Sequence, residues 1–374
     1  MEPRGSAFSA RYFISTQGWP YLLVPFIPVA VALELTHASA PTIFFTAALG
    51  IVPTAALMGL ATEELAARSG PGIGGLLNVT FGNAPELIIA LFALAAGLHE
   101  VVKASIIGSI LGNILLVMGA AMLVGGLSRE RQTFNPTAAN VQALMLYLAA
   151  AALVMPAIFE LVEGKGLPPP GAEIVNYGSD VERLSVAVAV VLIATYVAGL
   201  LFSLRTHRSL FNPPYEDEET VGWSVRRSVL MLAVAGVAVG LMSEILVGSI
   251  AEASESVGVS EFFIGVIVVA IVGNAAEHWV AVLVAFKNKM DLAVNIAIGS
   301  SAQVALFVAP VLVFASYVLG PGPMALVFNG FEVGGVLIAV LAANYVTYEG
   351  ESTWFEGVQL LALYLILALA FLFA

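Results

Sequence analysis

Gly82-Asn83-Ala84-Pro85-Glu86 and Gly273-Asn274-Ala275-Ala276-Glu277 are two versions of one pentapeptide, and each lies inside a long apolar stretch. Two further pairs of segments repeat in the same order: Gly59-Leu60-Ala61-Thr62-Glu63 with Gly240-Leu241-Met242-Ser243-Glu244, and Gly108-Ser109 with Gly299-Ser300. Because three segments recur in one order, the sequence predicts an internal duplication with the two pentapeptides near its centre.

The composition places most of the chain in a lipid bilayer. Of its 374 residues, 60% are hydrophobic and 11% are charged, and its mean hydropathy is +0.97, whereas soluble domains carry about 25% charged residues. Apolar runs of about 20 residues are long enough to cross a hydrocarbon core. We predict an all-α polytopic membrane protein with about eleven transmembrane helices, at 20–36, 42–67, 72–98, 101–127, 136–161, 181–205, 223–248, 258–286, 289–318, 324–346 and 354–373.

Composition also excludes several functions. The chain has no cysteine, which removes disulfides, thiolate chemistry and Cys-ligated metals. Its net charge of -12 makes nucleic acid an unexpected partner. Membrane lipid is the expected surrounding, and a homo-oligomer is left open.

Five predicted spans separate each repeated element from its counterpart. Because five is odd, the two copies enter the membrane from opposite sides, which is the inverted-repeat architecture of secondary transporters. The predicted organisation is an N-terminal tail and first span (1–41), a first five-helix repeat (42–205), an acidic cytoplasmic linker (206–222) and a second five-helix repeat (223–374).

Basic residues predict the orientation, because Lys and Arg accumulate in cytoplasmic loops. One side of the predicted topology carries Arg4, Arg11, Arg68, Arg129, Arg131, Arg205, Arg208, Arg226, Arg227, Lys287 and Lys289. The other side carries Lys103, Lys165 and Arg183. The N-terminus is therefore predicted in the cytoplasm and the C-terminus on the opposite face.

The first span has a second interpretation as a cleavable signal peptide. Basic residues precede an apolar stretch from Tyr21, and Ala38-Ser39-Ala40 imitates a cleavage site. Glu34 interrupts the apolar stretch, and Pro41 would hinder cleavage just after the site. We therefore interpret this segment as a membrane span.

Glu86 and Glu277 are the strongest candidate site residues. A charged side chain inside a span costs about 2.5 to 3.5 kcal/mol on insertion scales and is functional by default. In each pentapeptide a glycine (Gly82 or Gly273) weakens the helix, and we expect a break that turns backbone carbonyls toward a ligand.

Both glutamates and the neighbouring amides of Asn83 and Asn274 offer oxygen atoms as possible ligands. Ca2+ takes about 6 to 8 oxygen ligands, and a carboxylate pair in a low dielectric favours protons once the cation leaves. We therefore predict a metal site that binds either Ca2+ or protons, with no catalytic residue and no cofactor. The alternatives are helix capping for the glutamates and interhelical hydrogen bonds for the asparagines.

Glu63 and Glu244 form a second symmetric acidic pair, each just after a hydroxyl residue. They could pass protons or ions toward the centre. For Glu63 and its neighbour Glu64, snorkelling to the membrane surface is the alternative.

Four polar residues near the pentapeptides are assigned to the same secondary pathway. His278 follows Glu277 and has no counterpart in the first repeat, so it could tune proton affinity or be a packed, hydrogen-bonded histidine. Ser109, Ser300 and Gln303 offer oxygens, with helix packing as the alternative. The acidic run Tyr215–Glu219 could concentrate or sense cytoplasmic Ca2+, or be a solvated charge run.

With these residues in view, the chain from about Gly59 onward resembles the calcium/proton exchangers of the cation/Ca2+ antiporter superfamily. The most specific parts are the stretches 82–90 and 273–278, supported by 299–307. The resemblance implies one span plus two five-span repeats, Glu86 and Glu277 as the central Ca2+/H+ residues, Glu63 and Glu244 as a secondary pair, and an acidic helix near 215–219. Pro85 departs from the family's usual hydroxyl or small residue, which puts the local shape of the third span in doubt.

The predicted function is exchange of Ca2+ for H+ by alternating access. A Na+/Ca2+ exchanger is the nearest alternative, although Leu87, Ile110 and Leu111 are apolar where Na+ ligands would be wanted. An intramembrane metal-dependent hydrolase would need a motif such as His-Glu-x-x-His, which the chain lacks, so we predict that it is not an enzyme. A prokaryotic inner (plasma) membrane is the favoured location, with a vacuolar membrane left open.

Overall fold

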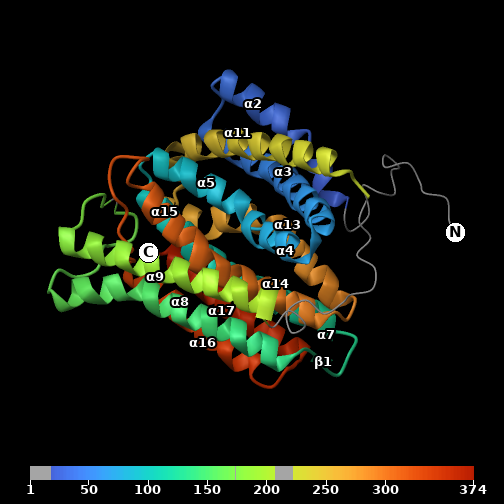
Figure 1. The fold of residues 1–374 in the computed structure, drawn as a ribbon. Helices are drawn as coiled ribbons and strands as arrows, with labels where there is room; N and C mark the ends of the chain where they lie inside the picture. Colours follow the sequence, from blue (N-terminus) through green and yellow to red (C-terminus); the bar gives the residue numbers. More distant parts are fainter. Residues whose placement is uncertain (1–17, 173, 207–221) are drawn as a thin grey trace.

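Helices make up nearly all of the fold (Figure 1), a computed structural model that describes residues 18–172, 174–206 and 222–374. Within these residues, nine helical segments are long and apolar enough to cross a membrane. Five are single helices, namely α3 (Ala40–Arg68), α8 (Pro136–Val162), α11 (Val225–Val257), α16 (Gly330–Thr347) and α17 (Trp354–Leu372).

The other four long segments contain a π-helical stretch, η2 to η5. They are α6 (His99–Leu111), η2 (Gly112–Val117) and α7 (Met118–Gly126); α9 (Ser179–Leu201) and η3 (Phe202–Thr206); α12 (Glu261–Phe263), η4 (Ile264–Val269) and α13 (Ala270–Phe286); α14 (Met290–Gln303), η5 (Val304–Val308) and α15 (Ala309–Ala315). Such stretches are frequent at functional sites.

Shorter helices occupy the two remaining predicted spans. η1 (Trp19–Leu23) and α2 (Phe26–Leu35) cover the first, and α4 (Gly70–Phe81) and α5 (Ala84–Ala95) cover the third. The prediction of a mostly helical membrane protein is confirmed. By length and hydropathy nine helices in the described part of the chain qualify as spans, two fewer than predicted.

Local sequence explains where the helices begin and end. Asn135 caps α8 by accepting from the backbone N–H groups of Thr137 and Ala138, and Pro136 follows at the first helical position, where no N–H is needed. α11 continues to Val257 and ends at Gly258, whose φ of 79° is the left-handed conformation that glycine adopts readily. The predicted end at 248 was therefore too early.

Two predictions about the chain near the face predicted to be non-cytoplasmic were wrong. Residues 324–329 were predicted as the start of a span, but they are extended and buried, and α16 begins only at Gly330. Lys103 was predicted at the start of the span 101–127, on the side of the loop before it, but it lies within α6 with 1% of its surface exposed. Hydropathy does not distinguish a buried extended segment from a helix, and a single lysine does not reveal that its partners are buried.

The helices form one bundle in which α3 and α11 lie side by side across one face (Figure 1). α17 packs on α7, and α9 packs on α15. A two-residue antiparallel pair, β1 (Gln132–Thr133) with β2 (Glu351–Ser352), joins two loops. Large hydrophobic side chains such as Val237, Leu341 and Ile366 are exposed on the spans, as expected for a surface that faces lipid.

Candidate ion-binding site

The two pentapeptides adopt different backbone conformations. In the first, α4 ends at Phe81 and α5 begins at Ala84, so the helix breaks at Gly82–Asn83 as expected. In the second, α13 runs without interruption through Gly273 and Asn274, so the expected break there was wrong. Pro85 explains the difference: proline has no N–H to bond to the carbonyl four residues earlier, whereas Ala276 at the matching position keeps its N–H.

Each glutamate packs against the glycine of the other pentapeptide. A methyl group built on Gly273 would lie 3.1 Å from Cγ of Glu86, and one built on Gly82 would lie 3.4 Å from Oε1 of Glu277. The side chains of α5 and α13 therefore cross reciprocally, and glycine at both positions leaves room for the carboxylates. Glu86 is 9% exposed, and Glu277 is partly buried.

Polar side chains from four helical segments surround this crossing. Asn83 donates through Nδ2 to Oε1 of Gln303 on α14 at 2.6 Å. Asn274 donates through Nδ2 to Oγ of Ser109 on α6 at 3.1 Å and to the carbonyl of Ala270 at 2.9 Å. Both asparagines therefore use their amide N–H groups to join helices, as the alternative interpretation expected.

Ser300 and His278 complete the surroundings of Glu277. Ser300 donates through Oγ to Oε2 of Glu277 at 2.9 Å. Nε2 of His278 lies 3.1 Å from Oδ1 of Asn113 on η2. His278 is thus a hydrogen-bonded histidine beside the site, and Asn113 is a site residue that the sequence analysis missed. A polar residue inside an apolar run, next to Gly112, was the available signal.

Four buried oxygen atoms in the two pentapeptides accept no hydrogen bond from any residue that the structure describes. Both carboxylate oxygens of Glu86 and the Oδ1 atoms of Asn83 and Asn274 have no hydrogen-bond partner on another described residue. Buried polar atoms in folded proteins are nearly always hydrogen-bonded, and unpaired carboxylate and amide oxygens are what a hard cation takes as ligands. The donor set therefore fits a cation such as Ca2+.

Glu63 on α3 and Glu244 on α11 have exposed side chains, in contrast to the buried Glu86. Among the residues that the structure describes, no cluster of three or more His, Asp or Glu side chains is arranged to hold a metal ion. A cation at the crossing would thus be bound by two carboxylates together with neutral oxygens. The acidic run Tyr215–Glu219 lies outside the described residues.

Glu64 has a role that the sequence analysis did not assign. It is 1% exposed, and its two carboxylate oxygens accept from the backbone N–H groups of Gly222 at 3.1 Å and Trp223 at 2.9 Å. Snorkelling to the membrane surface was therefore the wrong alternative for Glu64, which attaches the segment before α11 to the end of α3.

The family model for the sodium/calcium exchanger protein matches residues 39–205 and 227–373, nearly the whole of the spanning region. The chain belongs to the sodium/calcium exchanger family. The two matched segments coincide closely with the two predicted five-helix repeats and leave the linker between them unmatched.

Three relatives that match most of this chain are described as calcium transporters or Ca2+/H+ antiporters. A "Ca(2+)/H(+) antiporter" of Synechocystis is 46% identical over 94% of this chain and 96% of its own length. The "Ca(2+)/H(+) antiporter ChaA" of Bacillus subtilis is 44% identical over 92% of this chain and 96% of its own length. A "Vacuolar calcium ion transporter" of Schizosaccharomyces pombe is 39% identical over 94% of this chain and 84% of its own length.

A solved structure matches the fold over almost all of the chain. The structure of native YfkE superposes with a TM-score of 0.80 at 40% identity, covering 95% of this chain and all of that chain. The resemblance to calcium/proton exchangers predicted from the pentapeptides is thereby confirmed. The membrane-length apolar helices of the described residues, together with these relatives, support an integral membrane protein.

Proposed function

We propose that this chain is a Ca2+/H+ antiporter whose Glu86 and Glu277 bind either Ca2+ or protons. The observation that carries this proposal is the reciprocal crossing of the two pentapeptides, where four buried oxygens have no hydrogen-bond partner within the described chain. Relatives at 44% and 46% identity that carry the antiporter description support the choice of ions.

The asparagines supply oxygen ligands in this proposal. Their Nδ2 atoms donate to Gln303 and Ser109. The Oδ1 atom of each amide points away from this hydrogen bond between helices. Together with the carboxylates, these oxygens provide part of a Ca2+ shell of about 6 to 8. Backbone carbonyls near Gly82, freed by the break between α4 and α5, would contribute further ligands. The first repeat would therefore supply more backbone ligands than the second, where the helix is continuous.

The polar residues around the two glutamates are assigned secondary roles from their positions. Ser300 can donate to Glu277 while that glutamate carries charge, and His278 with Asn113 forms the polar wall next to it. Ser109 and Gln303 hold the asparagines. We assign Glu63 and Glu244, exposed on α3 and α11, to the paths by which ions approach the centre from the two sides.

Alternating access would use two inverted five-helix repeats. Three features support this organisation: the two matched family segments, the reciprocal glutamate–glycine contacts, and the equivalent packing of α17 on α7 and α9 on α15. We place the linker 206–222 in the cytoplasm, with the acidic run as a candidate Ca2+ sensor. Bacterial and vacuolar relatives leave both a plasma membrane and a vacuolar membrane open.

Single cysteines test the topology in this cysteine-free chain. We expect Thr220→Cys and Ala374→Cys to react with a membrane-impermeant maleimide from opposite sides, because the basic residues place the linker in the cytoplasm and the C-terminus outside. Labelling of both positions from one side would contradict an odd number of spans between them and hence the inverted repeat.

Ca2+ uptake into proteoliposomes tests the choice of coupling ion. We expect uptake when a pH gradient is imposed and none when a Na+ gradient of the same size replaces it. A protonophore should abolish the pH-driven uptake. Uptake driven by Na+ alone would identify a Na+/Ca2+ exchanger and overturn the proposal.

A further inference from the structure

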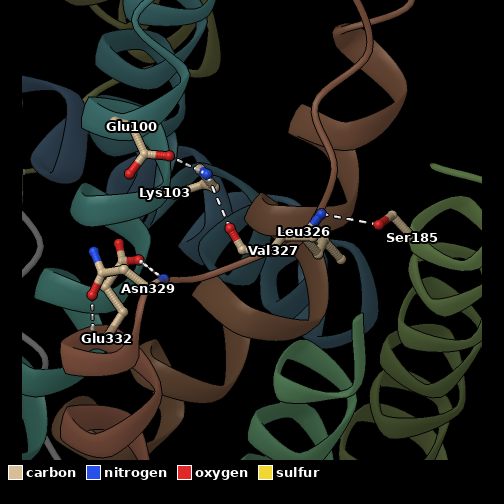
Figure 2. A network of polar contacts seen from close by, with 7 residues as sticks. All are labelled: Glu100, Lys103, Ser185, Leu326, Val327, Asn329 and Glu332. Carbon is tan, nitrogen blue, oxygen red and sulfur yellow. Dashed lines mark hydrogen bonds and ion pairs between the residues drawn. The ribbon is translucent and has the colours of Figure 1, made fainter. Parts of the chain in front are cut away.

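Besides the central glutamates, the fold contains a second cluster of buried charges, which Figure 2 shows. Glu100 and Lys103 on α6 form an ion pair, and Glu332 lies at the start of α16. Their exposed fractions are 1%, 1% and 0%. Lys103 precedes Ser109 by six residues on one helix, which separates the cluster from the level of the central site by about 9 Å along the axis.

The cluster surrounds the extended segment 324–329 between α15 and α16. Met324 to Phe328 are fully buried, so their backbone groups need partners inside the protein. Lys103 donates through Nζ to the carbonyl of Val327 at 2.9 Å, and the N–H of Leu326 donates to Oγ of Ser185 on α9 at 3.0 Å (Figure 2). Side chains from two spans therefore hold this segment in place.

Glu332 fixes the end of the same segment. Its Oε2 accepts from the N–H of Asn329 at 2.8 Å, while Oδ1 of Asn329 accepts from the N–H of Glu332 at 3.0 Å, a complete capping box. Oε1 of Glu332 has no hydrogen-bond partner among the described residues. The capping bond is compatible with either a carboxylate or a carboxylic acid, because only an acceptor oxygen is required.

The charges in this cluster do not balance if both acids are ionised. Two carboxylates would face one ammonium, and an uncompensated buried charge is strongly destabilising. The Glu100 carboxylate is matched by Lys103 in the ion pair. A proton on Glu332 makes the remaining charge zero.

The other ionisable groups around the cluster do not change its net charge. Tyr177, whose ring lies 5.7 Å from Nζ of Lys103, is neutral as a phenol. Glu160 on α8 lies 3.5 Å from Lys165, which also forms an ion pair with the more exposed Glu163 at 2.8 Å. A hydrogen bond to Glu163 and the charge of Glu160 raise the pKa of Lys165, which keeps that lysine cationic. His99 has no hydrogen-bond partner for either ring nitrogen within the described part of the chain, and a charge on it would face the like charge of Lys103.

We propose that Glu332 carries a proton in the folded protein at neutral pH and is a second proton-binding site, separate from Glu86 and Glu277. The proton neutralises the cluster that holds residues 324–329 against α6. Loss of this proton at alkaline pH leaves one negative charge among buried groups and weakens the attachment of the segment. This site does not depend on the proposed central site.

Infrared spectroscopy of the full-length protein tests the proposal. The Glu86→Gln/Glu277→Gln double variant serves as the background, so that protons on the central pair contribute no signal whether or not they exist. We expect a carboxylic-acid C=O band at neutral pH that disappears on alkalinisation and is missing when Glu332→Gln is added. Glu356→Gln is the matched control, because Glu356 forms the same capping box with Thr353 but is less buried; it should leave the band unchanged.

Lys103→Met is an independent test, in which the carboxylic-acid band should increase instead of disappearing. Without the ammonium both acids should take protons, so the band should grow to about twice its area. A band that Glu332→Gln leaves intact, or that Lys103→Met does not increase, would overturn the assignment. As a second measurement, the melting temperature of the background protein should fall with rising pH, and Glu332→Gln should flatten that dependence; an unchanged dependence also overturns it.

Discussion

Glu86→Gln and Glu277→Gln are each expected to reduce pH-driven Ca2+ transport by at least about a hundredfold, or about 2.7 kcal/mol in the binding of the transported ion. Glutamine keeps the size of each side chain and one oxygen, but it neither attracts Ca2+ as a charge nor exchanges a proton. Initial Ca2+ uptake into proteoliposomes, at matched amounts of inserted protein, measures the effect.

The same variants should remain folded, which separates an ion-binding role from a structural one. Both carboxylate oxygens of Glu86 are without a hydrogen-bond partner on another described residue, so Glu86→Gln breaks no bond that stabilises the fold. Burying a neutral amide is less costly than burying a charge. Glu277→Gln keeps a carbonyl oxygen that can accept from Ser300. The melting temperature of either variant without Ca2+ is therefore expected to equal or exceed that of the wild type.

Glu349→Gln provides the matched control for charge removal, since Glu349 is exposed between α16 and β2, outside the spans. It should transport Ca2+ at the wild-type rate. Near wild-type transport by either central variant would remove that glutamate from the site. Loss of transport together with loss of the folded protein would instead support the capping or pairing role considered from the sequence.

The central pair could be predicted from the sequence because it leaves two independent signals. Charged residues inside apolar runs are rare, and here the same pentapeptide surrounds both of them. Duplication also indicated that the two would approach each other. Asn113 is uncharged and has no repeated counterpart, so it carried neither signal and was missed.

Other features depend on contacts between distant segments, which no local pattern encodes. In the sequence Lys103 resembles a basic residue at the exposed end of a span, and only the fold shows Glu100, Val327 and Glu332 around it. Glu64 and Glu63 are adjacent acids, and only the fold shows that Glu64 is buried against backbone N–H groups. The continuous helix at Gly273 could have been inferred locally, because Ala276 lacks the helix-breaking property of Pro85.

Ca2+ binding at constant pH is expected to release protons. If Glu86 and Glu277 bind either Ca2+ or protons, the two ions exclude each other. Linkage then requires that the apparent Kd for Ca2+ change about tenfold per pH unit for each proton released per Ca2+ bound. The sign follows from competition: lowering the pH on the binding side adds protons to the site and weakens Ca2+ binding. Release of two protons would give about a hundredfold change per pH unit over the range where both glutamates titrate.

Isothermal titration calorimetry in buffers with different ionisation enthalpies counts the released protons, because the observed heat then varies linearly with the buffer's enthalpy. The slope for wild type should lie between one and two protons per Ca2+. Glu349→Gln should leave the slope unchanged, whereas the Glu86→Gln/Glu277→Gln double variant should lose both binding and release.

Single variants distinguish a shared site from two separate ones. With only one ionisable glutamate left at the crossing, whatever weak binding survives in Glu86→Gln or Glu277→Gln should release at most one proton per Ca2+. Glu332 should not contribute to the slope, since its cluster lies about 9 Å away along α6 and binds no Ca2+ in our proposals. Ca2+ binding with no proton release at any pH would mean that the ions use different sites, and the buried oxygens at the α5–α13 crossing would then be a Ca2+ site without a direct role in proton coupling.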